Sequence, residues 1–445
     1  VGTTTLTAAI DTVQTEIPIA DPVWFNQMNN NTLNTAMVGK ELIRYGRVSE
    51  TAPWQLLDCE RGAWDTRPSI HETGAPIAKL MDHGYRVFLT NPELSLEVAR
   101  RIADLFNETG LMQVSFDGLE GNWSTGLGQY GRTLFTQAWY EHLNPALRGR
   151  VINDASNPGH FNWHIYTRMN WGEPWYAGFR ESQTQYRLKN QNYYARNLMP
   201  RMLGWFQMSP GTTLEDAEWL LARAAGFDAG FCLVTSPNTV RRNGAGDAIL
   251  AAINRWETAR LAGAFPEPAK AALRDIQHEF HLETVSADTW NLYPVHSVKG
   301  VHRRREQPGM ITTTEFSFDH PHATQPLQFI LQATGKNETR DLVLELNGRE
   351  ALSVAVPLAA GQILRYAGGE TMLRCNAQGQ TLESIAVNPK RLQVAPGKTQ
   401  IRIGARLAAG DDSGLKCEFR TVGAPDRLSQ PEITEAEKAE ERKGS

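Results

Sequence analysis

The sequence has no long apolar run and no excess of either charge. Its longest apolar stretches are broken by charged residues or proline well before the ~20 residues that a bilayer span needs, so we expect no transmembrane helix. Lys and Arg total 45 against 49 Asp and Glu, which gives a formal net charge of -4 and predicts no surface for nucleic acid. With 41% hydrophobic and 21% charged residues, the composition is that of a globular protein.

Cysteine is also scarce. The four cysteines, Cys59, Cys232, Cys375 and Cys417, are far apart and show no C-x-x-C spacing, which excludes a zinc ribbon and a thioredoxin-like motif. Cys375 and Cys417 both fall in the C-terminal β-rich region, where they either form a bridge or remain packed thiols.

Several catalytic and targeting motifs are absent. The sequence contains no G-x-S-x-G, no Walker A loop and no H-E-x-x-H, and RRNGAGDAIL (241–250) lacks the G-x-G-x-x-G spacing, so no cofactor is predicted. Residues 1–10 have neither the charged segment nor the cleavage site of a signal peptide. Because the chain also lacks an initiator Met, we expect that upstream sequence holding a signal has been removed and that the protein is secreted or periplasmic.

Aromatic residues are abundant and unevenly distributed. Nine of the twelve tryptophans lie between Trp54 and Trp219. Planar aromatic rings at this density suit the C–H faces of sugar rings, although large aromatic side chains also fill cores.

Strands and helices alternate from residue 85 to residue 280. The expected strands are 85–89, 112–116, 150–153, 161–169, 203–208 and 228–234, and the expected helices are 94–109, 130–142, 183–199, 217–226, 246–263 and 268–280. Asn91 and Pro92 mark the start of the first helix and Gly110 its end, and Thr213 to Asp216 resemble a capping box before the helix 217–226. Short connections between alternating elements indicate parallel strands with crossover helices. The predicted fold is therefore α/β, a (β/α)8-type barrel. About six units are found where eight close the ring, so either the missing units lie upstream of Val1 or the barrel is incomplete at its N-terminus.

The composition changes near residue 305, after which short strands alternate with turn residues. This spacing is typical of an antiparallel β-sandwich. We expect a barrel domain over 1–305, in which 11–80 form an insertion or a β subdomain, a β-sandwich domain over 306–425, and a charged tail over 426–445.

The stretch LMQVSFDGLEG (111–121) ends an apolar strand with acidic residues. Asp117 follows the strand, Gly118 permits a sharp turn, and Glu120 and Trp123 come next. Parallel strands carry functional side chains at their carboxyl ends, so Asp117 is expected at the mouth of a site. The alternative is that Asp117 only caps the turn that follows it.

A second polar stretch covers residues 160–186. If 161–169 is a strand, its period of two places Asn162, His164, Tyr166 and Arg168 on one face, and WGEPW (171–175) forms the loop beyond it. Glu173 lies between Trp171 and Trp175, where desolvation would raise its pKa and keep it protonated as a general acid.

Other roles remain open for the charged residues of this stretch. Arg180 and Glu181 either form an internal ion pair, or Arg180 joins Arg168, Arg187 and Lys189 in meeting a uronate or sulfate group of a substrate. His160 and His164 are ~13 Å apart if both lie on one strand, so no metal site is predicted from them.

The combination of VSFDGLEG at a strand end, WGEPW beyond a later strand and a trailing β-rich region resembles (β/α)8-barrel glycoside hydrolases with a C-terminal β-domain, such as the α-galactosidase-like group. The resemblance implies that Asp117 acts as nucleophile or base and Glu173 as acid, with Glu120 as a substitute for either. The expected partner is a carbohydrate substrate. The residues expected to bind it are Trp123, His160, Trp163, His164, Tyr166, Arg168, Trp171, Trp175, Arg180 and Glu181.

Two alternatives to a glycosidase remain. In a polysaccharide lyase, His164 or Tyr166 would abstract a proton beside a uronate carboxylate that Arg168 or Arg180 neutralises. A non-catalytic carbohydrate-binding protein would keep the aromatic side chains without working acids.

Overall fold

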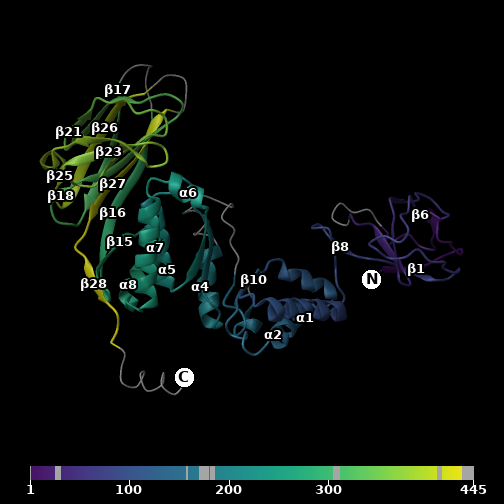
Figure 1. Cartoon of the computed structure of the whole chain (residues 1–445). Helices are drawn as coiled ribbons and strands as arrows, with labels where there is room; N and C mark the ends of the chain where they lie inside the picture. Colours follow the sequence, from purple (N-terminus) through teal and green to yellow (C-terminus); the bar gives the residue numbers. More distant parts are fainter. Residues whose placement is uncertain are drawn as a thin grey trace. The chain divides into compact units, whose positions relative to one another are not determined.

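The computed structural model describes residues 2–25, 32–156, 159–169, 180, 186–303, 311–407 and 413–432. The chain divides into two compact units, Val1–Thr167 and Arg168–Ser445, and Figure 1 labels their elements. In the described parts of the chain, no helix is long and apolar enough to cross a membrane.

The first unit begins with short strands that pair in antiparallel fashion around a small core of its own. They are β1 (Gly2–Thr5), β2 (Ile17–Pro18), β3 (Thr35–Val38), β4 (Glu41–Arg44), β5 (Arg47–Val48), β6 (Gln55–Leu57), β7 (Pro76–Lys79), β8 (Asp82–His83) and β9 (Val87–Phe88). Their orders are β1-β7-β3-β4 and β2-β6-β5, with β8 and β9 as a separate hairpin. Side chains such as Leu6, Ile43 and Leu56 are fully buried between them.

The helix predicted after Asn91 and Pro92 is confirmed as α1 (Pro92–Thr109). The Asn91 side chain accepts a hydrogen bond from the backbone N–H of Leu94 at 2.8 Å, as an N-cap residue does. Gly110 ends the helix in the left-handed conformation, at φ 70°, which glycine adopts without strain.

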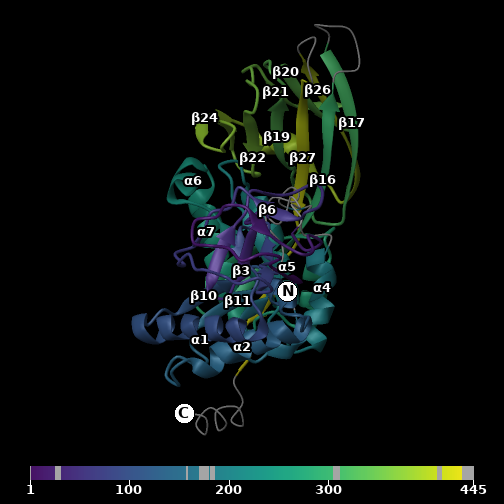
Figure 2. The ribbon, with the colours of Figure 1, turned by 90° about the vertical axis from the view of Figure 1, so that its right-hand side faces the viewer.

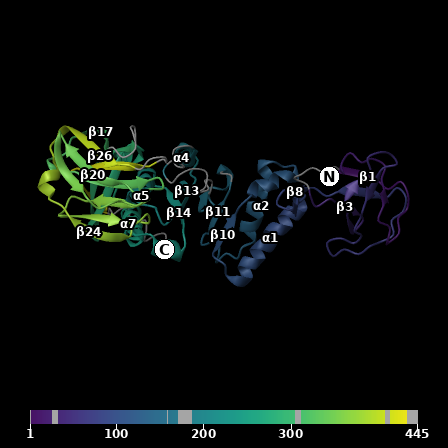
Figure 3. The same cartoon turned by 90° about the horizontal axis from the view of Figure 1, so that it is seen from above.

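A pair of parallel strands, packed with helix α2 and two short 3-10 helices, completes the first unit. It comprises β10 (Gln113–Phe116), η1 (Leu119–Thr125), α2 (Gln129–His142), β11 (Ile152–Ala155) and η2 (His160–Asn162). Strands β10 and β11 pair in parallel, with Phe116 opposite Ala155. Helices α1 and α2 pack on each other, side by side in Figure 3, and Trp139 of α2 packs edge-on against Phe106 and Phe116.

The second unit opens with α/β elements. They are β12 (Arg168–Met169), α4 (Tyr186–Arg196), β13 (Met202–Gln207), α5 (Leu214–Phe227), β14 (Gly230–Val234), α6 (Pro237–Arg242), α7 (Gly246–Leu261) and α8 (Glu267–Arg274). Strands β13 and β14 pair in parallel. Helix α5 packs on α7 and α8, and these helices share a core with the strands that follow, in which Trp256, Leu273 and Trp290 are buried.

The remaining strands of the second unit form what we call the two-sheet region. They are β15 (Glu279–Ser286), β16 (Thr289–Arg303), β17 (Ile311–His320), β18 (Gln325–Pro326), β19 (Gln328–Thr334), β20 (Arg340–Leu346), β21 (Arg349–Val354), β22 (Ile363–Tyr366), β23 (Thr371–Cys375), β24 (Thr381–Ala386), η3 (Pro389–Leu392), β25 (Gln393–Val394), β26 (Gly397–Arg406), β27 (Gly414–Val422) and β28 (Asp426–Ser429).

Two antiparallel sheets enclose the core of this region. One has the order β15-β16-β27-β19-β22-β23-β24, with β28 also on β16, and the other has the order β17-β26-β20-β21 (Figure 2). Side chains of both sheets, such as Phe329 and Ile403, are fully buried in one cluster. Cys375 and Cys417 are separate buried thiols, so the packed alternative holds.

The strands predicted over 85–89 and 161–169 form at only two residues each, Val87–Phe88 of β9 and Arg168–Met169 of β12. Val87 and Phe88 form half of the antiparallel β8–β9 hairpin rather than a barrel strand, because the chain turns at Arg86, whose N–H donates to the His83 carbonyl. Residues 160–162 form η2, and the Asn162 carbonyl then accepts from the N–H groups of Ile165 and Tyr166. The parallel pairs β10–β11 and β13–β14 belong to different units, and the closed barrel stays a prediction.

Candidate functional site

Asp117 lies where two parallel strands end. It follows β10 directly and is exposed. The next residue, Gly118, has a φ of 77°, which turns the backbone into η1. Ser156, just beyond β11, accepts hydrogen bonds through Oγ from the N–H groups of Gly118 and Leu119 at 2.9 and 3.3 Å. The turn that carries Asp117 is therefore fixed by the neighbouring strand.

Exposed aromatic side chains occupy the segments that follow these strands. Trp123 of η1 is 44% exposed, and Phe161 and Trp163, in and just after η2, are 55% and 49% exposed. Both η1 and η2 contact α2, so the two segments border the same helix. Side chains with this much exposed ring area can pack on a ligand.

The predicted polar face of residues 162–168 does not form. His164 is exposed and lies edge-on to Trp163, whereas Tyr166 is 3% exposed and its hydroxyl shares a 2.5 Å hydrogen bond with Thr136. Burial raises the pKa of Tyr166 above its ordinary value, which disfavours the phenolate. Because the helical turn at Asn162 breaks the period of two, Tyr166 does not face solvent and is a poor candidate for a lyase base.

The two predicted arginines contact protein groups of the second unit. Arg168 donates through Nη1 to the Cys232 sulfur at 2.9 Å. Arg180 forms ion pairs with Asp216 at 2.6 Å and Glu279 at 2.8 Å. Burial would lower the pKa of Arg180, but the two carboxylates raise it further, so this guanidinium is engaged in an internal ion-pair network rather than open to a substrate anion.

Several predicted site residues lie outside the described residues. These are Trp171, Glu173, Trp175 and Glu181, together with the side chains of Glu120 in η1 and His160 in η2. The structure therefore places Asp117, Trp123 and Trp163 on the segments that follow β10 and β11 in the first unit, and the partner acid stays a prediction. Among the described residues, no group of three His, Cys, Asp or Glu side chains could hold a metal ion.

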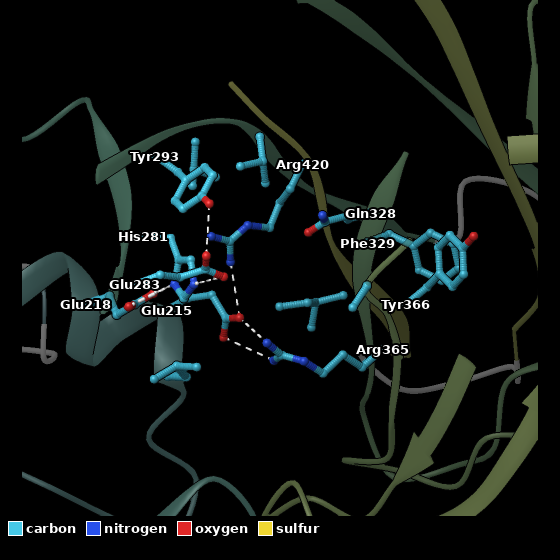
Figure 4. Close-up of a pocket in the computed structure, with 15 residues that line it drawn as sticks. Glu215, Glu218, His281, Glu283, Tyr293, Gln328, Phe329, Arg365, Tyr366 and Arg420 are labelled. Atoms are coloured by element: carbon cyan, nitrogen blue, oxygen red, sulfur yellow. Dashed lines mark hydrogen bonds and ion pairs between the residues drawn. The ribbon is translucent and has the colours of Figure 1, made fainter. Parts of the chain in front are cut away.

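A cavity of about 480 Å³ opens in the second unit between α5 and the two-sheet region (Figure 4). Its polar lining residues are Glu215, Glu218, His281, Glu283, Tyr293, Gln328, Arg365 and Arg420, and its apolar lining includes Leu214, Val295, Ile330 and Val422. The volume lies within the range of roughly 300–1,000 Å³ that is usual for small-molecule sites.

Glu215 is the most tightly held acid of this cavity. Its carboxylate lies between the guanidinium groups of Arg365 and Arg420, with Arg365 Nη1 at 3.1 Å and Arg420 Nη1 at 3.2 Å (Figure 4). Burial alone would raise the pKa of Glu215, but the two arginines outweigh it and hold the pKa at about 2. Glu215 is therefore ionised at neutral pH.

A second chain of contacts starts one helical turn further along α5, at Glu218. His281 Nδ1 lies 2.9 Å from both carboxylate oxygens of Glu218, and His281 Nε2 lies 3.5 Å from Glu283. The Tyr293 hydroxyl donates to Glu283 at 2.9 Å. Burial would lower the pKa of His281, yet the hydrogen bond to Glu218 raises it overall, which favours the charged imidazolium.

The sequence did not reveal this cavity. Thr213 to Asp216 gave a helix-capping signal, and Thr213 does cap α5, accepting from the Asp216 N–H at 3.1 Å, so Glu215 had an ordinary explanation. The available signal was a charged residue placed between buried apolar positions of expected strands, as with Arg365 between Leu364 and Tyr366. Such positions indicate an outer sheet face that meets another polar surface.

No protein-family model matches the chain, and no curated protein sequence matches it either. Similar solved structures include the isomalto-dextranase of Arthrobacter globiformis T6 in complex with panose, with 9% identity, 75% of this chain and 72% of that chain covered, and a TM-score of 0.28. An Anoxybacillus alpha-amylase has 9% identity over 72% of this chain and 64% of its own, with a TM-score of 0.25. CBM35 of Paenibacillus barcinonensis has 16% identity over 29% of this chain and 92% of its own, with a TM-score of 0.16. These scores are too low to establish a shared fold.

Proposed function

We propose that the protein is a glycoside hydrolase that acts on a poly- or oligosaccharide. The observation that carries the proposal is the position of Asp117, an exposed carboxylate on a turn at the carboxyl end of a parallel strand, with exposed aromatic rings on the segments that follow. This is where α/β enzymes carry their functional groups. The proposed architecture is a barrel followed by a β-sandwich, in a secreted or periplasmic protein.

In the proposed mechanism, Asp117 acts as nucleophile or base. Glycoside hydrolysis needs one carboxylate that faces the anomeric carbon and one carboxylic acid that protonates the leaving oxygen. Glu173 is the proposed acid, with Glu120 as the substitute for either role. Trp123 and Trp163 would pack on sugar rings, and the other proposed contacts come from His160, His164, Trp171 and Trp175.

The products of the purified chain on a panel of neutral and uronate-containing polysaccharides test the proposal. Hydrolysis releases new reducing ends without absorbance at 235 nm, whereas elimination gives an unsaturated uronide that absorbs there. Elimination would favour the lyase alternative, and binding without either product would favour a carbohydrate-binding protein.

Asp117→Asn should abolish turnover and leave the circular dichroism spectrum unchanged. The matched control is Asp104→Asn, because Asp104 is an exposed aspartate of the same unit whose carboxylate contacts His142 on the surface. Normal turnover by Asp117→Asn would remove Asp117 from the mechanism. Glu173→Gln should slow substrates with poor leaving groups most, because they depend on protonation.

A further inference from the structure

The cavity of the second unit combines opposite charges in near balance. Its lining holds three carboxylates, Glu215, Glu218 and Glu283, against the guanidinium groups of Arg365 and Arg420 and the imidazole of His281. Each of the three carboxylates contacts at least one of these cationic groups. A ligand ion of either sign would therefore meet groups of its own sign and gain little from the charges of the wall.

The same groups offer fixed hydrogen-bond donors and acceptors. A carboxylate accepts about four hydrogen bonds and a guanidinium donates about five, so the ion pairs leave capacity on both sides. The side-chain amide of Gln328 lines the cavity, and among the described residues it has no hydrogen-bond partner. Groups that both donate and accept, such as hydroxyls, suit such a wall.

Apolar surface completes the cavity. Leu214, Val295, Ile330 and Val422 line it together with the ring of Tyr293. A pyranose ring presents hydroxyl groups around its edge and C–H groups on its faces, so one ring can use both kinds of surface. An inorganic ion or a purely apolar ligand would use only one of them.

We infer that this cavity is a binding site for a neutral saccharide, held by hydrogen bonds between its hydroxyl groups and Gln328, Glu283 and the arginine-paired carboxylate Glu215. The site lies within the second unit and does not depend on Asp117 of the first, so the inference does not rest on the proposed hydrolysis. It gives the two-sheet region a binding role.

The experiment uses the full chain and four probes. Methyl α-D-glucopyranoside and methyl α-D-galactopyranoside are the neutral probes, and D-glucuronate and D-glucosamine are their charged counterparts. Saturation-transfer NMR detects binding, and hydrogen exchange shows whether peptides covering 214–227 and 279–293 become protected. We expect at least one neutral glycoside to bind and protect these peptides, and the charged sugars to bind more weakly.

Variants locate the binding. Gln328→Ala and Glu283→Ala should each weaken binding about tenfold, which corresponds to about 1.4 kcal/mol. Gln332→Ala is the matched control, because Gln332 lies on the same strand with the same half-buried setting and does not line the cavity. Asp117→Asn should leave the protection of these peptides unchanged, which separates this site from the hydrolytic one.

Three outcomes would overturn the inference. They are no protection of the cavity peptides by either neutral glycoside, tighter binding of a charged sugar than of both neutral ones, or equal affinity in Gln328→Ala, Glu283→Ala and the unmodified chain. The first would leave the cavity as a hydrated ion-pair junction between α5 and the two-sheet region.

Discussion

Replacing Glu215 with glutamine should destabilise the second unit by about 3 kcal/mol at pH 7. Glu215 is 7% exposed, and its pKa is held at about 2 against an ordinary value of 4.5. At about 1.4 kcal/mol for each pH unit, this difference corresponds to roughly 3.4 kcal/mol. The amide also leaves two guanidinium groups without their carboxylate, and breaking a buried pair in this way costs about 3–5 kcal/mol.

The pH dependence of this loss has a definite sign. Because folding lowers the pKa of Glu215, the stabilisation is complete above about pH 4.5 and is lost as the pH falls toward 2. The difference between Glu215→Gln and the unmodified chain should therefore shrink to roughly 1.4 kcal/mol at pH 3. A loss that is the same at pH 3 and pH 7 would mean that packing, rather than charge, holds this residue.

Hydrogen exchange resolved by peptide is the suitable assay, because a chain of two units need not unfold in one step. The opening free energy of peptides from α5, β22 and β27 should fall in Glu215→Gln, while peptides from the first unit keep theirs. Glu338→Gln is the control, since Glu338 pairs with Arg340 at the surface with 41% of its side chain exposed, where such pairs contribute about 0–1 kcal/mol. Equal losses in the two variants would refute the reasoning.

Three further predictions concern other polar groups that are buried or half-buried. Burial lowers the pKa values of His296 and His322, so the two-sheet region should lose stability as the pH falls below about 6.5. In a His296→Gln, His322→Gln double variant, the midpoint of chemical denaturation should depend less on pH than in the unmodified chain. Glu41→Gln should destabilise the first unit by about 3–5 kcal/mol in chemical denaturation, because the Glu41 carboxylate is fully buried and paired with Arg61. An unchanged stability in this variant would contradict an ionised Glu41. Tyr166→Phe should cost about 1 kcal/mol of stability in the same assay and should leave turnover intact, and a large loss of turnover would restore this hydroxyl as a catalytic candidate.

Local patterns in the sequence predicted local structure well. Asn91, Pro92 and Gly110 marked both ends of α1, because capping depends only on residues within one helical turn. The placement of Asp117 at a strand end followed from the apolar run before it and the glycine after it. These features need no information about distant parts of the chain.

The strand predicted over 161–169 shows the limit of periodicity. Alternating polar and apolar side chains satisfied the period of two, but the Asn162 carbonyl accepts two local hydrogen bonds and bends the chain into a turn. The alternating side chains therefore lie on either side of a turn rather than along one strand. For this reason the pattern placed Tyr166 in the site, although Tyr166 is buried in the core.

The cavity of the second unit could not be predicted, because its contacts join distant residues. Glu215 and Arg365 are separated by 150 positions, and no short-range pattern links them. Glu215 also couples stability to binding, because it joins α5 to the strands of Arg365 and Arg420 and presents a carboxylate to the cavity. If the cavity binds a saccharide, Glu215→Gln should lower the affinity for the sugar as well as the stability. The same concentration of a neutral glycoside should then stabilise this variant less than it stabilises the unmodified chain, because stabilisation by a ligand grows with its affinity. Equal recovery in both would show that Glu215 is a structural link and takes no part in the binding.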